Sequence, residues 1–304
     1  MVTRASRIEP VELPPARYDY GGDEFVFVDL DQAMSFQVNF KVQAICKEVA
    51  RRKIPGVIEI APGNASYLIR IDPDTIAADD LIRDLKEIER QSADTSELHL
   101  TTRVVDMPVL YDDPWTHETL MKFRDHHQTP DKTDLEFVAE VNGFQSTAQF
   151  IEAHHHAPYF VTMVGFVPGT PWCLQMVPIE RQLQVPKYVR PRTDTPDRAL
   201  SHGGAFLAIY PVQGPGGYQL FGRIAPPIFD PHQELPDFAT SVVFPRPGDI
   251  FKLRPVDRSE YDRIREQVEA KTFRYHTVPV EFEPGRFYED PDAYTERLLS
   301  ALSP

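Results

Sequence analysis

Proline limits the folds open to this chain more than any other residue type. The 304 residues include 29 prolines, about twice the usual share of this residue. Proline fixes its own backbone angle, lacks an N–H group and breaks the interior of a helix. We therefore expect a β protein rich in loops rather than a bundle of helices.

The second half of the chain carries the clearest pattern. From Tyr159 onwards, short apolar runs are interrupted by proline and glycine, which is typical of a β-barrel or a β-sandwich. The runs cover residues 159–166, 203–210, 218–224, 241–244 and 250–253. Helical spacing returns at 257–271 and 291–299.

The residues before Tyr159 show both strand-like and helix-like patterns of apolar residues. Strands are predicted at 24–29, 57–60 and 67–71, and helices at 36–53 and 77–91. This order is typical of a small α+β domain with an antiparallel sheet. A strand at 98–110 leaves the domain, and helices follow at 116–128, at 133–141 and from Ser146, a favourable N-cap, to about His154.

These patterns predict an α+β fold in four parts. Residues 1–20 form an irregular leader, and residues 21–105 form the small α+β domain. Residues 106–256 form the β-rich domain, and residues 257–304 form a C-terminal extension that contains helices.

Composition excludes several classes of protein. The 32 Lys and Arg face 46 Asp and Glu, a formal charge of −14, which argues against binding nucleic acid or anionic lipid. No run approaches the roughly 18 apolar residues of a membrane span, and residues 1–15 lack the apolar core of a signal peptide. Cys46 and Cys173 are too few for a disulfide framework, so we expect a protein of the reducing cytoplasm.

The histidines and glycines offer candidate chemistry. Adjacent side chains at His154–His156 cannot all converge on one ion, so no metal is expected there, although one of them could bind substrate or move a proton. His126 and His127 are expected to be solvated on a helix. The glycines of 214–219 either allow a ligand to approach the backbone or form a hairpin turn, and the turn is favoured.

A basic cluster lies in a loop of this acidic chain. It consists of Lys187, Tyr188, Arg190 and Arg192. The cluster either holds a carboxylate or a carboxylated cofactor, since arginine is a planar two-pronged donor, or it pairs with acids at the surface. Both interpretations remain open on the residues alone.

Several strings resemble one family. Gly165–Pro171 reads G-F-V-P-G-T-P and resembles the G-F-x-P-G-x-P loop of the allophanate hydrolase subunit 1 family. That family includes the kinase-A inhibitor type and the B-type subunit of the bacterial 5-oxoprolinase. The family's Y-P…P-G-G-W-Q…G-R signature and closing P-G-D are similar to Tyr210-Pro211, Pro215–Leu220, Gly222-Arg223 and Pro247–Asp249.

The resemblance is closer to one half of the carboxyltransferase domain of urea carboxylase. The pattern there, K-Y-N-P-A-R-T-x-T-P-E-N-A-V-G-I-G-G, is matched at Lys187-Tyr188, Arg192-Thr193, Thr195-Pro196, Ala199 and Gly203-Gly204. The run from Gly203 to Pro211 keeps the urea-type spacing. The resemblance extends from about residue 20 to residue 275.

The family implies both a fold and partners. The expected fold is a ferredoxin-like α+β domain followed by a cyclophilin-like β-barrel. The expected partners are a homologous second carboxyltransferase half similar to allophanate hydrolase subunit 2, a biotin carboxylase and a biotin carrier. This chain has neither a P-loop nor a Met-Lys-Met biotinyl motif. Carboxybiotin would therefore come from the separate carrier, ATP would bind only at a partner, and no metal is expected here.

The resemblance also assigns candidate site residues. His154 precedes the Gly165–Pro171 loop and is a candidate base near neutral pH, and Lys187 and Arg192 are candidate catalytic cations. The expected pocket residues are Tyr188, Gly203, Gly204, Tyr210, Gly216, Gly217, Tyr218, Gln219 and Arg223, with Phe166, Pro168 and Gly169 in the loop. We expect Lys187→Ala or Arg192→Ala to abolish turnover without unfolding the chain.

Two departures from the urea-type pattern leave the acceptor open. Gly165–Pro171 follows the oxoprolinase style, and Leu200–Gly204 stands where the urea type has V-G-I-G-G. The first hypothesis is carboxyl transfer from carboxybiotin to urea or a urea-like or amide acceptor. The second is a subunit of an ATP-dependent 5-oxoprolinase-type lactam or amide hydrolase. The third is a non-catalytic inhibitor of a histidine kinase.

Overall fold

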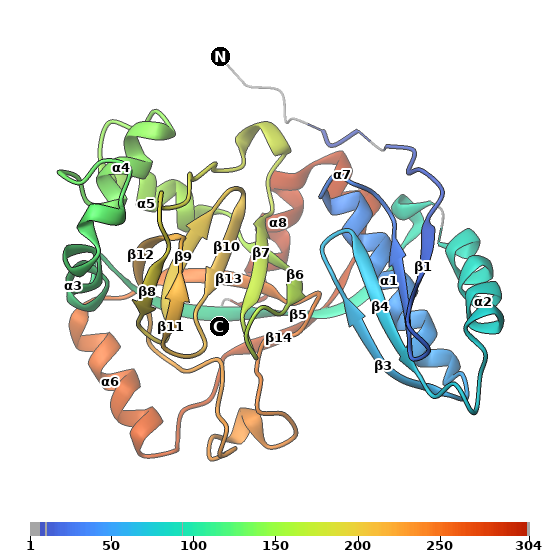
Figure 1. Ribbon diagram of the computed structural model, residues 1–304. Helices are drawn as coiled ribbons and strands as arrows, with labels where there is room; N and C mark the ends of the chain where they lie inside the picture. Colours follow the sequence, from blue (N-terminus) through green and yellow to red (C-terminus); the bar gives the residue numbers. More distant parts are fainter. Residues whose placement is uncertain (1–6, 10, 93, 303–304) are drawn as a thin grey trace. The chain divides into compact units, whose positions relative to one another are not determined.

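A computed structural model describes residues 7–9, 11–92 and 94–302 of the chain (Figure 1). It divides into two compact units. The first comprises Met1–Thr102 and Glu281–Tyr294, and the second comprises Arg103–Val280 and Thr295–Pro304. The C-terminal residues therefore belong partly to each unit, where the sequence suggested a separate extension.

The first unit contains an antiparallel sheet with the strand order β1-β2-β4-β3 among its described residues. Two helices, α1 and α2, belong to the same unit. The bounds are β1 Arg17–Gly21, β2 Phe25–Asp29, α1 Phe36–Arg52, β3 Val57–Pro62, β4 Ser66–Ile71 and α2 Ala78–Gln91. The helices and the three predicted strands are present.

The predicted leader is wrong over its last residues. Arg17–Gly21 forms β1, which pairs with β2 along its whole length. Tyr18 explains the pairing, since its ring packs on the core of this unit and its hydroxyl donates to Glu89 Oε2 at 2.7 Å. Residues 1–6 and 10 of the expected leader lie outside the described residues.

Aromatic packing draws the C-terminal segment into the first unit. Helix α1 begins at an N-cap, Ser35, whose side chain accepts from Val38 N. Its first turns present Phe36 and Phe40, which contact Phe282 and Phe287 with ring centroids 5.1–6.2 Å apart. Phe287 lies on α7, Pro284–Glu289. Burial of these rings holds residues distant in sequence together.

The second unit is a closed β-barrel. Seven strands of the described chain follow one another in the order β12-β9-β10-β7-β6-β13-β5, and β5 also pairs with β12, which closes the ring. Strand β14 extends the sheet at β5. The bounds are β5 Leu100–Tyr111, β6 Tyr159–Val164, β7 Pro171–Gln175, β9 Ala199–Gly203, β10 Phe206–Ile209, β12 Gln219–Ile224, β13 Ile250–Pro255 and β14 Thr277–Phe282. The prediction of an α+β fold with a β-barrel is confirmed.

A short ribbon and several helices complete this unit. The ribbon pairs β8, Arg192–Thr195, with β11, Gly214–Gly216. The helices are α3 Pro114–Lys122, α4 Asp134–Val141, α5 Thr147–His156 and α6 Arg258–Glu269, with 3₁₀ turns at Arg124–His126, Ile179–Arg181 and Pro236–Phe238. The 3₁₀ turn Thr95–Glu97 belongs to the first unit, and helix α8, Pro291–Ser300, contributes residues to both units. In the part of the chain that the structure describes, no helix has the length and apolar character needed to cross a membrane.

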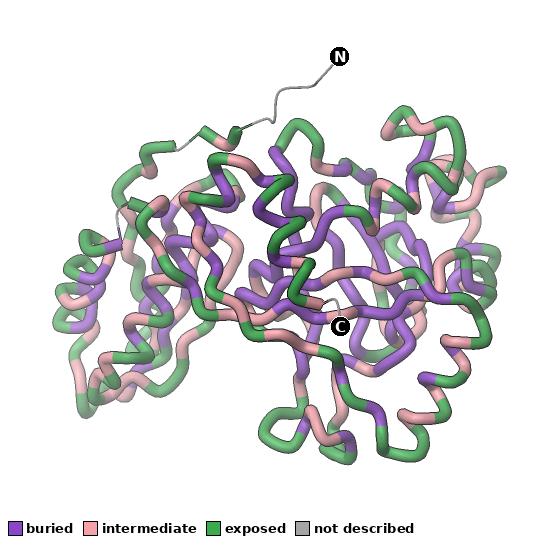
Figure 2. The backbone as a smooth tube through the Cα atoms, turned by 180° about the vertical axis from the view of Figure 1, so that it is seen from behind, coloured by how far each residue is buried: buried purple, intermediate pink, exposed green. Residues whose placement is uncertain are grey.

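Two expectations for this region are wrong. Residues 214–219 do not form a simple hairpin turn, because Gly214–Gly216 pairs with β8. Residues 241–244 form no strand. Within the described part of the chain, they make a single isolated β-bridge, between Val243 and Phe229. Figure 2 shows that buried residues gather in the inner segments of the backbone, whereas the outlying segments carry most of the exposed residues.

A buried ion pair fastens strand β13 to the start of the barrel. Arg103 Nε and Nη2 donate to the two carboxylate oxygens of Asp249 at 2.9 and 2.8 Å. Arg103 Nη2 also donates to Phe244 O, and the guanidinium lies 4.4 Å from the Phe244 ring centroid. The Asp249 side chain is 3% exposed, so the pair is shielded from water and salt.

We predict that Asp249→Asn destabilises the protein by about 3 kcal/mol, because it leaves a largely buried guanidinium without its counter-charge. The free energy of unfolding in urea measures the loss. The control is Asp262→Asn, which breaks the exposed pair with Arg258 on α6 and should cost about 0.5 kcal/mol or less. Equal costs for the two variants would contradict the prediction.

Candidate active site

A cavity of about 270 Å³ lies on the outer face of the barrel. Strand alternation explains its position, because successive side chains point to opposite faces of a sheet. Leu207 and Ile209 of β10 belong to the barrel core, so Ala208 between them faces outward. Ala208 pairs with Trp172 of β7, and both line the cavity.

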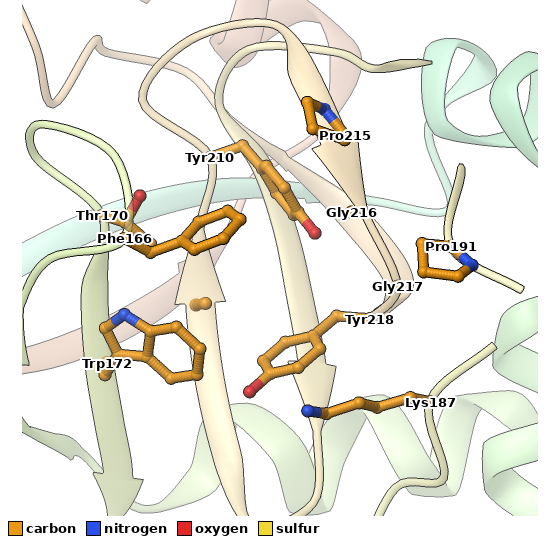
Figure 3. Close-up of a pocket in the computed structure, with 11 residues that line it drawn as sticks. Phe166, Thr170, Trp172, Lys187, Pro191, Tyr210, Pro215, Gly216, Gly217 and Tyr218 are labelled. Atoms are coloured by element: carbon orange, nitrogen blue, oxygen red, sulfur yellow. The ribbon is translucent and has the colours of Figure 1, made fainter. Parts of the chain in front are cut away.

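Four aromatic side chains line the cavity. Figure 3 shows Phe166, Trp172, Tyr210 and Tyr218 arranged around one hollow. The Trp172 and Tyr218 rings meet edge to face, with centroids 5.6 Å apart and planes at 85°. Lys187 reaches across this wall, and its Nζ lies 5.3 Å from the Tyr218 ring centroid. The remaining lining residues are Thr170, Ala208, Pro191, Pro215, Gly216 and Gly217.

Two glycines make room for these rings. A Cβ added at Gly216 would lie 1.9 Å from the Tyr210 hydroxyl oxygen, and one added at Gly203 would lie 2.3 Å from Tyr218 Cδ1. Atoms cannot approach so closely, so any larger residue would displace a wall of the cavity. Gly203 therefore shapes the site from behind without lining it.

The polar groups at the cavity are few and mostly neutral. Burial raises the pKa values of Tyr210 and Tyr218, so both phenols keep their protons at neutral pH. The Thr170 hydroxyl is buried and has no hydrogen-bond partner among the described residues. The exposed Lys187 supplies a positive charge. Such an arrangement suits a flat ligand that carries a few hydrogen-bonding atoms and a partial negative charge.

The structure brings only some of the expected site residues to the cavity. Those that line it are Phe166, Lys187, Tyr210, Gly216, Gly217 and Tyr218. Those that do not line it are His154, Tyr188, Arg192, Gly203, Gly204, Gln219, Arg223, Pro168 and Gly169. Arg223 instead binds Asp197 and lies 5.1 Å from the Trp115 ring.

Arg192 is not part of an exposed basic cluster, which corrects the expectation for this residue. Its side chain is fully buried. Its Nη2 donates to Tyr218 O at 2.7 Å and its Nε donates to Thr195 Oγ1 at 3.2 Å. The guanidinium carbon lies 4.4 Å from the Tyr188 ring centroid. Arg192→Ala would therefore remove internal structure, and the expectation that it leaves the fold intact no longer holds.

His154 lies in the protein interior and not at the cavity. Its Nδ1 is 2.9 Å from the Tyr111 hydroxyl, and its Nε2 is 3.5 Å from His202 Nδ1. Burial, followed by the neighbouring His202 and His155, lowers the pKa of His154 well below its ordinary value. The ring is therefore neutral at pH 7, and a base poised near that pH has to be sought elsewhere.

His127 is also buried, although it was expected to be solvated. Its Nδ1 accepts from Thr129 N at 2.9 Å, and its Nε2 lies 3.1 Å from Gln219 Oε1. No group of three or more His, Cys, Asp or Glu side chains within the described part of the chain is arranged to hold a metal ion.

We predict that the buried histidines make the protein sensitive to acid. Burial lowers the pKa of His202 to about 3, against about 6.5 in the unfolded chain. Below pH 6.5 the unfolded chain takes up a proton that the folded state refuses, so stability falls as the pH drops towards 3. His202 alone should cost about 2 kcal/mol between pH 8 and pH 5.

Urea unfolding at a series of pH values measures this loss. His202→Gln should show a shallower fall in stability below pH 6.5 than the wild-type protein. His156→Gln is the matched control, because the His156 side chain is 81% exposed and is not desolvated on folding. A wild-type pH profile for His202→Gln would contradict the prediction.

Five lining residues were not predicted from the sequence: Thr170, Trp172, Pro191, Ala208 and Pro215. A signal for two of them was present, because Thr170 lies within the Gly165–Pro171 string and Trp172 follows it directly. Trp172 is one of only two tryptophans in the chain. Ala208 carries no chemical signal and becomes visible only through the strand register.

Comparison with known proteins identifies the family. The model of the carboxyltransferase domain, subdomains C and D, matches residues 16–239. The chain belongs to this carboxyltransferase family. The resemblance found in the sequence is thus confirmed at the level of the family.

Relatives of this carboxyltransferase-family chain include a small part of a much longer protein and a subunit of similar length. Urea amidolyase of Saccharomyces cerevisiae is 26% identical over 268 residues, which are 86% of this chain but 14% of the yeast protein. The chain thus spans only a small part of that relative. The B-type subunit of 5-oxoprolinase from Bacillus subtilis is 26% identical over 256 residues, 81% of this chain and 95% of that subunit.

A solved structure shares the fold. Urea amidolyase of K. lactis superimposes with a TM-score of 0.77 at 20% identity, over 97% of this chain and 18% of that one. At this identity the likeness concerns the fold alone. The α+β architecture with a barrel is therefore that of the corresponding part of the larger enzyme.

Proposed function

We propose that this chain is one half of the carboxyltransferase of a biotin-dependent carboxylase. In this role it moves a carboxyl group from carboxybiotin to urea or to a urea-like or amide acceptor. The family match carries the proposal, and the aromatic cavity with its single lysine supports it. The partners would be a homologous second half, a biotin carboxylase and a biotin carrier.

The cavity residues fit a ureide ring. The volume of about 270 Å³ lies just below the roughly 300–1,000 Å³ of typical ligand pockets, which suits a small planar group. Trp172 and Tyr218 offer flat apolar faces to such a group. When bound, carboxybiotin would supply the carboxyl group that is transferred.

The chain's own residues then have distinct tasks. The aromatic walls exclude water from the bound group, which strengthens electrostatic interactions inside the cavity. The Lys187 ammonium lies at the wall and can neutralise negative charge on the carboxyl oxygens. The neutral phenols of Tyr210 and Tyr218 act as hydrogen-bond donors and not as bases.

A second function is favoured by the loop at the cavity edge. Gly165–Pro171 follows the 5-oxoprolinase style, and it contributes Phe166 and Thr170 to the lining. The match to the B-type subunit of 5-oxoprolinase points the same way. In that case the cavity would hold a lactam, and the partners would drive its opening with ATP.

The native complex purified from the source cell separates the two functions. ATP-dependent incorporation of labelled bicarbonate into urea, blocked by avidin, is expected for the carboxylase. Release of glutamate from 5-oxoproline that avidin does not affect would instead establish the second function. If neither activity appears over a range of ureas, amides and lactams, the enzymatic proposal is wrong.

We predict that Lys187→Ala lowers turnover of the complex at least about a hundredfold, the order of loss seen when one stabilising donor is removed from a developing negative charge. The fold should persist, because Lys187 is exposed. Turnover and urea unfolding are measured together. Lys271→Ala, which breaks an exposed pair with Glu234, is the control. Wild-type turnover in Lys187→Ala would remove Lys187 from the mechanism.

A further inference from the structure

We propose that Asp134 is a positioning residue that holds one wall of the cavity in place through Tyr188 and the backbone of Leu220. Asp134 does not line the cavity. The inference rests on the proposed function only in assuming that the ligand binds in this cavity. Three described segments meet at Asp134: the start of α4, the loop 185–191 and the chain 217–220.

Helix α4 delivers the carboxylate to its place. Thr133 is the N-cap of a capping box, in which its side chain accepts from Glu136 N and the Glu136 side chain accepts from Thr133 N. This arrangement fixes the first turn of the helix. Asp134 follows directly, and its carboxylate is buried, with 2% of the residue exposed.

The carboxylate receives a donor from each side of the wall. Tyr188 donates its hydroxyl to Asp134 Oδ1 at 2.6 Å, and Leu220 N donates to Oδ2 at 2.6 Å. His127 Nε2 lies 3.6 Å from Oδ1. A hydrogen bond to a buried charge is among the strongest in a protein, and a buried charge without donors is costly. Both segments are therefore held to one point.

Tyr188 passes this constraint on to the cavity. Its backbone N donates to Gly217 O at 2.8 Å, so the residue next to Lys187 is bonded to a lining residue. Its ring lies beneath the Arg192 guanidinium, which also donates to Tyr218 O. Tyr188 is thus held at its hydroxyl, at its ring face and at its backbone.

Gln219 adds a second connection between the same segments. Its Nε2 donates to Pro186 O at 2.9 Å, and its Oε1 lies 3.1 Å from His127 Nε2. Gln219 is fully buried, so it supports the wall and does not reach the ligand. Asp134 is the charged residue that bonds both to the loop, at Tyr188, and to strand β12, at Leu220.

The inference assigns a direction to the coupling. Loss of the carboxylate releases the Tyr188 hydroxyl and Leu220 N. The chain from Gly217 to Leu220 can then shift, and it carries the Tyr218 ring with it. Trp172 packs edge to face on that ring, so the environment of Trp172 reports any movement of the wall.

Fluorine NMR of protein labelled with 5-fluorotryptophan tests the inference without any assay of activity. The chain has two tryptophans, and Trp172→Phe assigns their signals. Asp134→Ala and Tyr188→Phe should each move the Trp172 signal. Trp115, which packs on Tyr261, serves as the reference for the fold. The double variant, Asp134→Ala with Tyr188→Phe, should shift the Trp172 signal little more than Asp134→Ala alone, because both changes break the hydrogen bond between Tyr188 and Asp134.

Asp134→Asn should restore most of the Trp172 signal. Its amide oxygen can accept from Leu220 N, and its NH₂ can donate to the Tyr188 oxygen. Asp125→Asn is the matched control, since Asp125 binds Arg190 of the same loop at an exposed site, and it should move neither signal. If Asp134→Ala does not fold, Tyr188→Phe, which keeps the ring, still tests the inference.

Three outcomes would overturn the inference. They are an unchanged Trp172 signal in folded Asp134→Ala or Tyr188→Phe, equal movement of both tryptophan signals, and no recovery in Asp134→Asn.

In the active complex, Tyr188→Phe should raise the KM of the ligand that enters the cavity roughly tenfold, with a smaller effect on kcat. Absence of both proposed activities would refute the proposed function but not the signal shifts.

Discussion

The closure of the barrel between β5 and β12 is the constraint on which the cavity depends. Strand β5 pairs in parallel with β13 along Val104–Val109 and antiparallel with β12 at Val109–Tyr111. A closed sheet has no free edge, so each strand is held on both sides. The outer face of β7 and β10 is therefore fixed, and Trp172 and Ala208 form the rigid wall of the cavity.

The opposite wall is made differently, from a loop and a short ribbon. Such segments bury little apolar surface of their own, and here hydrogen bonds to buried charged side chains hold them in place. Arg192 and Asp134 are both almost completely buried, and each satisfies backbone groups of the chain 218–220. The site therefore combines a wall set by sheet geometry with a wall set by hydrogen bonds to charged groups.

Periodicity in the sequence was enough to find most regular elements. The helix Ala78–Gln91 buries Leu81, Ile82, Leu85 and Ile88 along one face, and the strand Ser66–Ile71 buries every second residue. Strands β7 and β8 escaped, since they are short and stand beside proline. The roles of Arg192 and Gln219 were beyond sequence reasoning. Both side chains are buried against partners that are distant in sequence, Tyr218 for Arg192 and His127 for Gln219. No local sequence pattern records these contacts.

The hairpin between β6 and β7 is the part of the cavity that can vary most among members of the family. Its residue Phe166 adopts a left-handed backbone with φ of 80° and is 70% exposed, yet it lines the cavity. Exposed hairpin tips tolerate insertion and deletion, because few contacts hold them. The specificity of the cavity can therefore drift through the length and sequence of this tip while the barrel and the buried charges stay unchanged.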